Sequence, residues 1–377
     1  MKIPLCLPSI DKKELNISNK ILKSKWLTSG KYNLDFEKKF SKYIGCKYAL
    51  SLNSCTSALE LAVKVNGLKK NDEVIAPSFT WVSSINAIIN AGAKPVLCDS
   101  DIKTKNVTAE YIKKKITKKT KAVMIVHYGG QICDMGKILK LIKKYKLILI
   151  EDSAETIGSK WNNKMCGSFG IGCFSFFPTK NITTGEGGML TTNSKKFYDQ
   201  CKLYIAHGIT KSTYQREKLD KPWQKVAALP GHNFRMSNLL AGIGLVQLSK
   251  IDELNKKRCQ IAKIYDENFK LFKDIIITPK TVKGVNHVYQ TYSILVNKKI
   301  REKLLIYLNK MGIGATVHFT PALHEQKIYK KYQHGSKLPN AKLLSDCSVS
   351  LPIYPDMKKK DAYYVSNKVI NFFNKFK

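Results

Sequence analysis

The stretch FSFFPTKNITTGEGGML, residues 174–190, joins the last two strands of the predicted core sheet through a turn that carries one lysine. The aromatic run FSFF is typical of a short buried strand. Lys180 follows this run, and Gly185, Gly187 and Gly188 come next, where they give the backbone room beside another group. The chain has 61 lysines and four arginines, and this combination of neighbours distinguishes Lys180 from the other lysines.

Around this stretch, short apolar runs alternate with helical patterns from about residue 46 to 190. The alternation predicts an α/β domain with a mostly parallel sheet. Asp99, His127 and Asp152 end three of the runs, and open α/β sheets bind ligands beyond the carboxyl ends of their strands, so we expect a site there. The predicted strands are 47–52, 72–78, 94–99, 121–127, 146–152, 172–177 and 187–192, and the helices between them are 56–67, 83–92 and 135–145.

A second, smaller domain is expected because 377 residues exceed the size at which one hydrophobic core usually stops growing. A long amphipathic pattern predicts a helix from Ser237 to about residue 272 that leads into this domain. We predict a large α/β domain over residues 1–248 and a small C-terminal α/β domain over residues 249–377. The elements predicted in the small domain are a strand at 287–296, a helix at 301–312 and a strand at 314–319.

Charge and cysteine content exclude several classes of function. The net charge of +37 comes almost entirely from lysines spread along the chain, whereas phosphate and base recognition favour the planar fork of arginine, so no nucleic-acid partner is expected. The ten cysteines form no C-x-x-C pair and no His/Cys cluster with zinc-like spacing, which predicts reduced thiols and no metal site. The N-terminus lacks an apolar signal segment and no run is long enough to span a membrane, so we expect a cytoplasmic protein without a membrane partner.

Two segments in which a strand leads into a turn carry candidate binding groups. In SLNSCTSALELAV, Thr56 and Ser57 lie at the start of a predicted helix, where free N–H groups and hydroxyls can bind an anion or simply cap the helix. In LILIEDSAE, Asp152 ends a buried strand and Glu155 follows three residues later. The Asp152 carboxylate can hold the proton of a ring nitrogen, or it can cap a helix.

The opening stretch and one further segment add a nucleophile and a flat surface. Lys180, which follows an apolar strand containing Ser175, can serve as an amine nucleophile toward an aldehyde. Trp81, in PSFTWVSS, can stack on a flat ring or pack in the core. An anion site, a carboxylate for a ring nitrogen, a stacking surface and a lysine for an aldehyde are together what one cofactor needs, pyridoxal phosphate (PLP).

Several further segments match one known family in their order and spacing, among them DEVIAPSFTWVSSINAI, TKAVMIVHYGGQICDM, HNFRMSNLLAGIGLVQL and SLPIYPDM. Over nearly its whole length the chain resembles the DegT/StrS-type sugar aminotransferases, which are PLP enzymes of fold-type I. The resemblance implies a seven-stranded-type sheet in a large PLP domain like that of aspartate aminotransferase. It also implies amino transfer from L-glutamate to a nucleotide-linked 4-keto sugar, in the synthesis of surface polysaccharides such as O-antigen or of lipid A sugars.

The resemblance gives each matching residue of the large domain a role toward PLP. Lys180 binds the cofactor covalently and moves the proton during transamination. Asp152 binds the pyridine nitrogen, and Trp81 stacks on the ring. The residues implied to bind the phosphate are Thr56, Ser57 and Ser175.

The resemblance also implies partners and a substrate site. Asn233 reaches the phosphate from the partner subunit, with Arg235 beside it, so a homodimer with shared active sites is implied. His318 and His324 fall where the family lines its nucleotide-sugar site, although ordinary packing or surface roles suit them equally.

Two residues depart from the usual pattern of the family. Cys55 occupies a position that is usually glycine, so the phosphate loop must adjust if that position needs a left-handed backbone. Glu155 stands where glutamine or histidine is frequent beside the cofactor's phenolic oxygen, so its carboxylate must be protonated or paired to approach that oxygen.

The sugar and its nucleotide stay open at this point. Glutamate at position 155 resembles the branch that makes GDP-perosamine. The branch that aminates a UDP-4-keto-pentose for lipid A is resembled instead by FTWVSS, VHYGGQ, KNITTGEGG, SLPIYPDM and the segment HGITKSTYQREKLDKPW (207–223). Amination at the 3-position is an alternative to amination at the 4-position. A PLP-dependent keto-sugar dehydratase is another alternative, but relatives of that kind replace the lysine by histidine. The remaining alternative is a non-catalytic basic protein that binds nucleic acid.

Overall fold

A seven-stranded mixed sheet forms the centre of the large domain in the computed structural model, which describes residues 2–210, 214 and 223–374. The strand order is β1-β9-β8-β5-β4-β2-β3, and only β9 runs antiparallel to its neighbours. All seven predicted strands are therefore confirmed, as is the mostly parallel α/β class. The strands are β1 (Tyr48–Leu52), β2 (Glu73–Pro77), β3 (Lys94–Cys98), β4 (Thr120–Val126), β5 (Ile148–Asp152), β8 (Ile171–Ser175) and β9 (Gly188–Thr192).

Helices cover both faces of this sheet, because its strands are apolar on both sides. In β2, Val74 and Ala76 pack into one hydrophobic cluster and Ile75 packs into the other. The first cluster includes α3 (Cys55–Lys64), α4 (Val82–Asn90) and α7 (Lys195–Tyr204). The second includes α2 (Lys31–Ile44), α5 (Ala109–Lys113), α6 (Met135–Tyr145) and the first half of α9 (Asn238–Phe269). The result is a three-layer domain.

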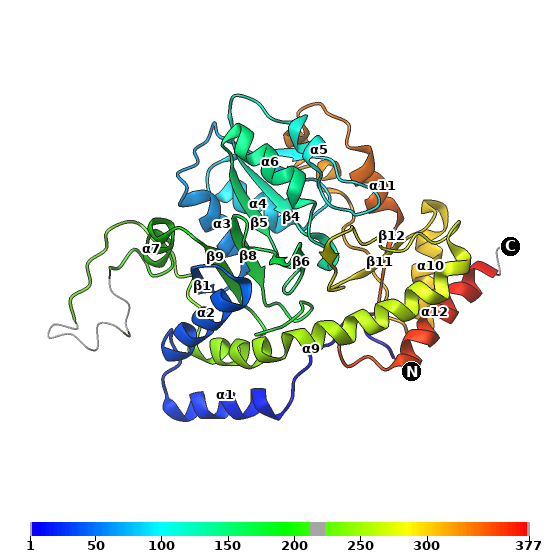
Figure 1. The fold of residues 1–377 in the computed structure, drawn as a ribbon, viewed down its shortest axis with the longest axis horizontal. Helices are drawn as coiled ribbons and strands as arrows, with labels where there is room; N and C mark the ends of the chain where they lie inside the picture. Colours follow the sequence, from blue (N-terminus) through cyan, green and yellow to red (C-terminus); the bar gives the residue numbers. More distant parts are fainter. Residues whose placement is uncertain (1, 211–213, 215–222, 375–377) are drawn as a thin grey trace.

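Helix α9 connects the sheet domain to the C-terminal elements, as the amphipathic pattern from Ser237 predicts. Its first half packs on α1 (Lys12–Ser24) and α2, and its second half packs on α12 (Lys359–Asn374), as Figure 1 shows. A third hydrophobic cluster, which includes Ile261, Tyr265 and Phe373, forms the core around this second half. The predicted division between residues 248 and 249 falls inside α9 and stays a prediction.

Some elements of the sequence prediction were wrong or missing. Residues 314–319 form no strand: Gly314 donates its N–H to the carbonyl of Ile3, Ala315 closes a turn, and only Thr316 makes a single bridge to Ser350. The predicted strand at 287–296 is shorter than expected. Helices α1, α2, α5, α7, α11 and α12 and strands β6, β7, β10 and β12 were not predicted. The remaining elements are β6 (Lys160–Trp161), β7 (Lys164–Met165), β10 (Val285–Asn286), β11 (Tyr292–Leu295), β12 (Ser348–Leu351), α10 (Lys298–Lys310), α11 (Pro339–Cys347), η1 (Tyr128–Gly130), η2 (Lys270–Phe272), η3 (Leu323–Glu325) and η4 (Lys330–Gln333).

No helix in the described part of the chain is both long and apolar enough to cross a membrane. No three His, Cys, Asp or Glu side chains in that part lie together in a way that could hold a metal ion. Most of the segment 207–223, on which one view of the sugar depends, lies outside the described residues.

Candidate active site

A cavity of about 370 Å³ opens at the carboxyl ends of the parallel strands β4, β5 and β8. It lies where an open α/β sheet is expected to bind its ligand. Residues from distant parts of the chain line it, including Gln290 and Phe319 from the C-terminal part. The structure brings together seven of the predicted site residues there: Thr56, Trp81, Asp152, Glu155, Ser175, Lys180 and His318.

Lys180 lies in the turn after β8, and its amine points to Glu155. The distance between Lys180 Nζ and Glu155 Oε1 is 3.3 Å, and both side chains are largely buried. The other carboxylate oxygen, Glu155 Oε2, accepts the N–H of Gly129 at 2.7 Å. Glu155, which stands where glutamine or histidine is frequent in the family, is thus a paired carboxylate: one oxygen accepts a backbone N–H and the other contacts the amine of Lys180.

Asp152 ends β5 and is 6% exposed. Its Oδ2 accepts a hydrogen bond from the hydroxyl of Ser84 at 2.8 Å, and its Oδ1 accepts the N–H of Ala154 at 3.2 Å. Burial raises the pKa of Asp152 above its usual value, and these two donors offset only part of that effect. Asp152 takes part in none of the ion pairs found among the described residues, although the charge of Lys180, which lines the same cavity, also opposes the effect of burial on its pKa.

The N-terminus of α3 forms one side of the same cavity. Ser54 caps the helix by accepting the N–H of Ser57, while the hydroxyl of Ser57 donates to Asn53 Oδ1 at 2.7 Å. Ser54, Cys55 and Thr56 line the cavity, whereas Ser57 lies buried just behind them. A helix N-terminus with free N–H groups and a nearby hydroxyl suits an anion such as a phosphate.

Cys55 does not need to be glycine. It is the first residue of α3 and has no positive φ, so the loop that was predicted to bind phosphate accommodates a side chain without backbone strain. The position that must be glycine is Gly188, where the backbone of β9 comes close to the backbone at the start of α3. A Cβ at Gly188 would lie 2.3 Å from the carbonyl carbon of Ser54 and 2.5 Å from Cys55 N. The glycine after the lysine turn therefore lets β9 pack against the start of α3.

Aromatic side chains border the mouth of the cavity. Trp81 lines the cavity and is 60% exposed. It therefore does not pack in the core, which the sequence had left open as an alternative. Its ring lies 6.1 Å from that of Phe319. His318, next to Phe319, bonds through Nδ1 to the hydroxyl of Ser350 at 2.9 Å, and burial lowers its pKa.

Four of the predicted site residues do not line this cavity: Ser57, which lies just behind its wall, and His324, Asn233 and Arg235. His324 bonds through Nδ1 to the Ser78 hydroxyl at 2.7 Å and borders a separate surface hollow with Lys330 and Lys342. Asn233 and Arg235 lie beside the end of β1, where Asn53 donates its N–H to the intervening carbonyl of residue 234 at 2.8 Å. Within one chain, Asn233 and Arg235 therefore lie near the turn that leads into α3, but they do not line the cavity.

Sequence reasoning missed several groups that shape the site. Gln290 lines the cavity and donates from Nε2 to the carbonyl of Thr179 at 2.8 Å. Gly129 supplies the N–H for Glu155, and its signal was available in the glycine pair of VHYGGQ, directly after the strand that ends near His127. Gln290 gave no such signal, because it follows no strand end and lies 111 residues from Thr179 along the chain.

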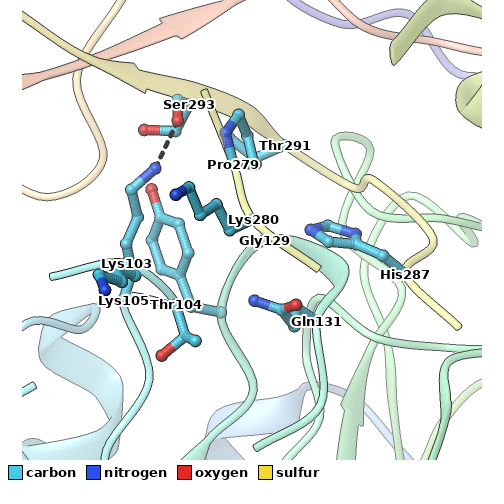
Figure 2. A pocket seen from close by; sticks show the side chains of 11 residues that line it. Lys103, Thr104, Lys105, Gly129, Gln131, Pro279, Lys280, His287, Thr291 and Ser293 are labelled. Atoms are coloured by element: carbon cyan, nitrogen blue, oxygen red, sulfur yellow. Dashed lines mark hydrogen bonds between the residues drawn. The ribbon is translucent and has the colours of Figure 1, made fainter. Parts of the chain in front are cut away.

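A second, much smaller cavity of about 10 Å³ lies beside the Gly129 turn, between residues 103–131 and residues 279–293. Figure 2 shows Lys105 reaching across it to donate a hydrogen bond to the carbonyl of Ser293 on β11. The Lys105 amine also lies 5.6 Å from the centre of the Tyr128 ring. The cavity has room for about one water molecule.

Comparison with known proteins places this site in a family. The family model described as the DegT/DnrJ/EryC1/StrS aminotransferase family matches residues 8–370. The chain is 40% identical over 375 residues to the uncharacterised protein MJ1066 of Methanocaldococcus jannaschii, covering 97% of this chain and 96% of that one. It is 38% identical over 376 residues to the GDP-perosamine synthase of Escherichia coli O157:H7, covering 99% of both chains.

A solved structure agrees in both fold and length. The PMP form of Spr1654 from Streptococcus pneumoniae superposes with a TM-score of 0.91 at 26% identity, covering 98% of both chains. Its PLP form superposes with a TM-score of 0.88 at 27% identity, covering 98% of this chain and 100% of that one. The chain therefore belongs to the DegT/DnrJ/EryC1/StrS aminotransferase family and is a sugar aminotransferase.

Proposed function

We propose that this enzyme uses PLP to transfer the amino group of L-glutamate to a nucleotide-linked 4-keto sugar, which becomes the 4-amino sugar. One observation carries the proposal: the Lys180 amine shares a cavity with a buried carboxylate and a helix N-terminus. The product is a building block for a surface polysaccharide such as O-antigen or for a modified lipid A.

The residues of the cavity fit PLP. The Asp152 carboxylate suits a protonated ring nitrogen, because it is buried and forms no ion pair in the part of the chain that the structure describes. Trp81 offers an exposed ring face. When bound, PLP supplies an aldehyde that combines with amines and a ring that withdraws electrons from the adjoining carbon. The phosphate ligands we assign at the start of α3 and the end of β8 are Thr56, Ser57 and Ser175.

Lys180 is the catalytic base of this proposal. As a neutral amine, Lys180 Nζ takes the proton from the α-carbon of glutamate and later delivers a proton to the sugar carbon. Glu155, at 3.3 Å, is placed to accept a proton from the ammonium form of Lys180. The Gly129 N–H fixes the carboxylate of Glu155 while this exchange takes place.

The substrate class rests on the C-terminal wall of the cavity and on one relative. His318, Phe319 and Gln290 line the same cavity as Lys180, and we assign them to the side that receives the second substrate. The GDP-perosamine synthase, 38% identical over 99% of both chains, supports a nucleotide-linked sugar as the substrate class. His324 is assigned to the outer part of the nucleotide-sugar site, next to the lysines of its surface hollow.

We also propose a homodimer in which Asn233 and Arg235 complete the phosphate site of the partner subunit. This fits their position outside the wall of their own cavity. Leu15 and Leu22 on α1 and Leu34 on α2 are exposed apolar side chains, which a second copy can cover. All ten cysteines are free thiols, in keeping with a cytoplasmic enzyme.

The test is a panel of GDP-, UDP- and dTDP-linked keto sugars incubated with L-glutamate, with 2-oxoglutarate measured as the product. We expect turnover with one 4-keto sugar, and NMR of the product distinguishes amination at the 4-position from the 3-position. Lys180→Ala abolishes turnover, and borohydride treatment of the wild-type holoenzyme traps the cofactor on the peptide that contains Lys180. Substantial turnover by Lys180→Ala, or release of water without amino transfer, contradicts the proposal.

A further inference from the structure

Arg258 in α9 is the largest of the fully buried side chains, with 1% of its surface exposed. It is one of only four arginines in a chain with 61 lysines. Its guanidinium group donates hydrogen bonds to three backbone carbonyls that belong to separate segments. These are the carbonyls of Ile353 (2.9 Å, from Nη1), Lys180 (3.2 Å, from Nη2) and Gln290 (3.4 Å, from Nη1).

No carboxylate accompanies this buried charge, since Arg258 is absent from the ion pairs of residues 2–210 and 223–374. Burial lowers the pKa of Arg258, but a guanidinium stays protonated in proteins. A buried charge without a counter-ion costs stability unless hydrogen bonds compensate it. The three carbonyls, together with Cys6 Sγ at 4.0 Å from Nη2, compensate the charge in part, while Nε is buried without a hydrogen-bond partner among the described residues. Arginine can reach all of them because its donors spread across a rigid plane.

Two consecutive backbone carbonyls, those of Thr179 and Lys180, each accept a side-chain hydrogen bond. Gln290 Nε2 donates to the carbonyl of Thr179 at 2.8 Å, and Arg258 Nη2 donates to the next carbonyl, that of Lys180. The N–H of Lys180 donates to the carbonyl of Phe177 at 2.9 Å. The backbone on both sides of the Lys180 Cα is therefore fixed, which leaves its side chain to extend toward Glu155.

We propose that Arg258 is a positioning residue that holds the backbone of Lys180 and joins it to the small domain through the carbonyls of Gln290 and Ile353. This inference rests on the proposed role of Lys180. Arg258 does not line the cavity and acts only through the peptide groups it binds. Lysine in its place has a compact ammonium group that cannot satisfy three separated carbonyls.

The test compares Arg258→Lys and Arg258→Ala with a matched control, Arg301→Lys. Arg301 also donates to a backbone carbonyl, that of Ser345 at 3.4 Å, and is partly buried, but it lies in the small domain away from Lys180. For Arg258→Lys we expect kcat to fall about 100-fold, as a displacement near 1 Å can cause, with KM for both substrates changed less than about threefold. Arg301→Lys should keep the wild-type kcat.

Two further readouts do not depend on turnover. In the apoenzyme, amide hydrogen exchange across residues 177–187 should be faster in Arg258→Lys than in the wild type, and unchanged in Arg301→Lys. Guanidinium at millimolar concentration should restore part of the kcat of Arg258→Ala and none of that of Lys180→Ala. Wild-type kcat and unchanged exchange in Arg258→Lys overturn the inference, as does faster exchange over the whole chain.

These outcomes separate the inference from the proposed function. If wild-type enzyme is not trapped on Lys180 by borohydride, the proposed function fails, while the exchange measurement on the apoenzyme still reports whether Arg258 fixes the 177–187 segment. If trapping succeeds and Arg258→Lys behaves as wild type, only the positioning role of Arg258 fails.

Discussion

At the scale of single residues, Asp152 can be tested separately from folding. In Asp152→Asn the carboxylate that keeps a ring nitrogen protonated is lost, so kcat should fall about 100-fold, equivalent to about 3 kcal/mol for a charge-assisted hydrogen bond. The apoenzyme should unfold at the same or a higher urea concentration than the wild type. The reason is that the folded pKa of Asp152 is raised, so its ionised form costs stability above that pKa. A destabilised apoenzyme with normal kcat contradicts this assignment.

Lys105 gives a pH-dependent prediction. Burial lowers its pKa to about 7 from 10.5, and no carboxylate is found among the residues described around its cavity, where the other titratable groups are Lys103, Tyr128, Lys280 and His287 (Figure 2). The folded state therefore binds fewer protons than the unfolded state between pH 7 and 10.5, so Lys105 costs stability below pH 7 and the cost fades as pH rises toward 10.5.

Lys105→Met should accordingly be more stable than the wild type at pH 6 by a few kcal/mol, and this advantage should shrink by pH 9.5. Urea unfolding of the apoenzyme at the two pH values measures it. Lys103→Met, at an exposed lysine of the same loop, is the control and should show no such trend. A stability difference that is equal at pH 6 and pH 9.5 excludes titration of Lys105 as its cause.

The site residues that could be identified from the sequence are those whose role is indicated by the residues next to them along the chain. Asp152 ends an apolar run and Lys180 follows one, so both could be predicted from a short window. Arg258 and Gln290 act on carbonyls 78 and 111 residues away, and nothing in their own segments indicates a partner. Glu155 was noticed, but the Gly129 N–H that pairs with it was not.

At the scale of elements, β9 and α3 depend on one glycine. A Cβ in Gly188→Ala would lie within 2.5 Å of the Ser54–Cys55 peptide, so the start of α3 must shift. We expect a loss of roughly 1–3 kcal/mol in unfolding free energy, the usual cost of overpacking, and weaker binding of PLP in a titration. Gly67→Asn is the control, because no atom lies near its Cβ position and asparagine tolerates its left-handed backbone. Normal PLP affinity in Gly188→Ala contradicts the role of α3 as phosphate site.

The elements themselves were predictable to different degrees for a physical reason. The seven core strands are buried on both faces, so each appears as an apolar run between polar turns. Residues 314–319 carry a similar alternation, but their backbone groups bond to the N-terminal segment and to turns, which no local pattern reveals. Helices α1 and α2 pack mainly on α9, far along the chain.

At the scale of the whole molecule, the proposed dimer can be tested by complementation. Asn233→Ala removes a residue that we assign to the partner's site, and Lys180→Ala removes one from its own site. Each variant alone should have little activity. After unfolding and refolding as an equal mixture, roughly one quarter of wild-type activity should return, because half of the dimers then contain one intact site of two. No recovery, with dimers confirmed by light scattering, contradicts shared active sites.

Helix α9 has one more consequence for the assembly of the chain. Its 32 residues extend for about 48 Å and enter two hydrophobic cores without a break. A protease or a gene truncation at residue 248 would therefore cut through a helix and strip both cores of part of their packing. We therefore expect a single cooperative unfolding transition of the apoenzyme, because the two cores share one helix.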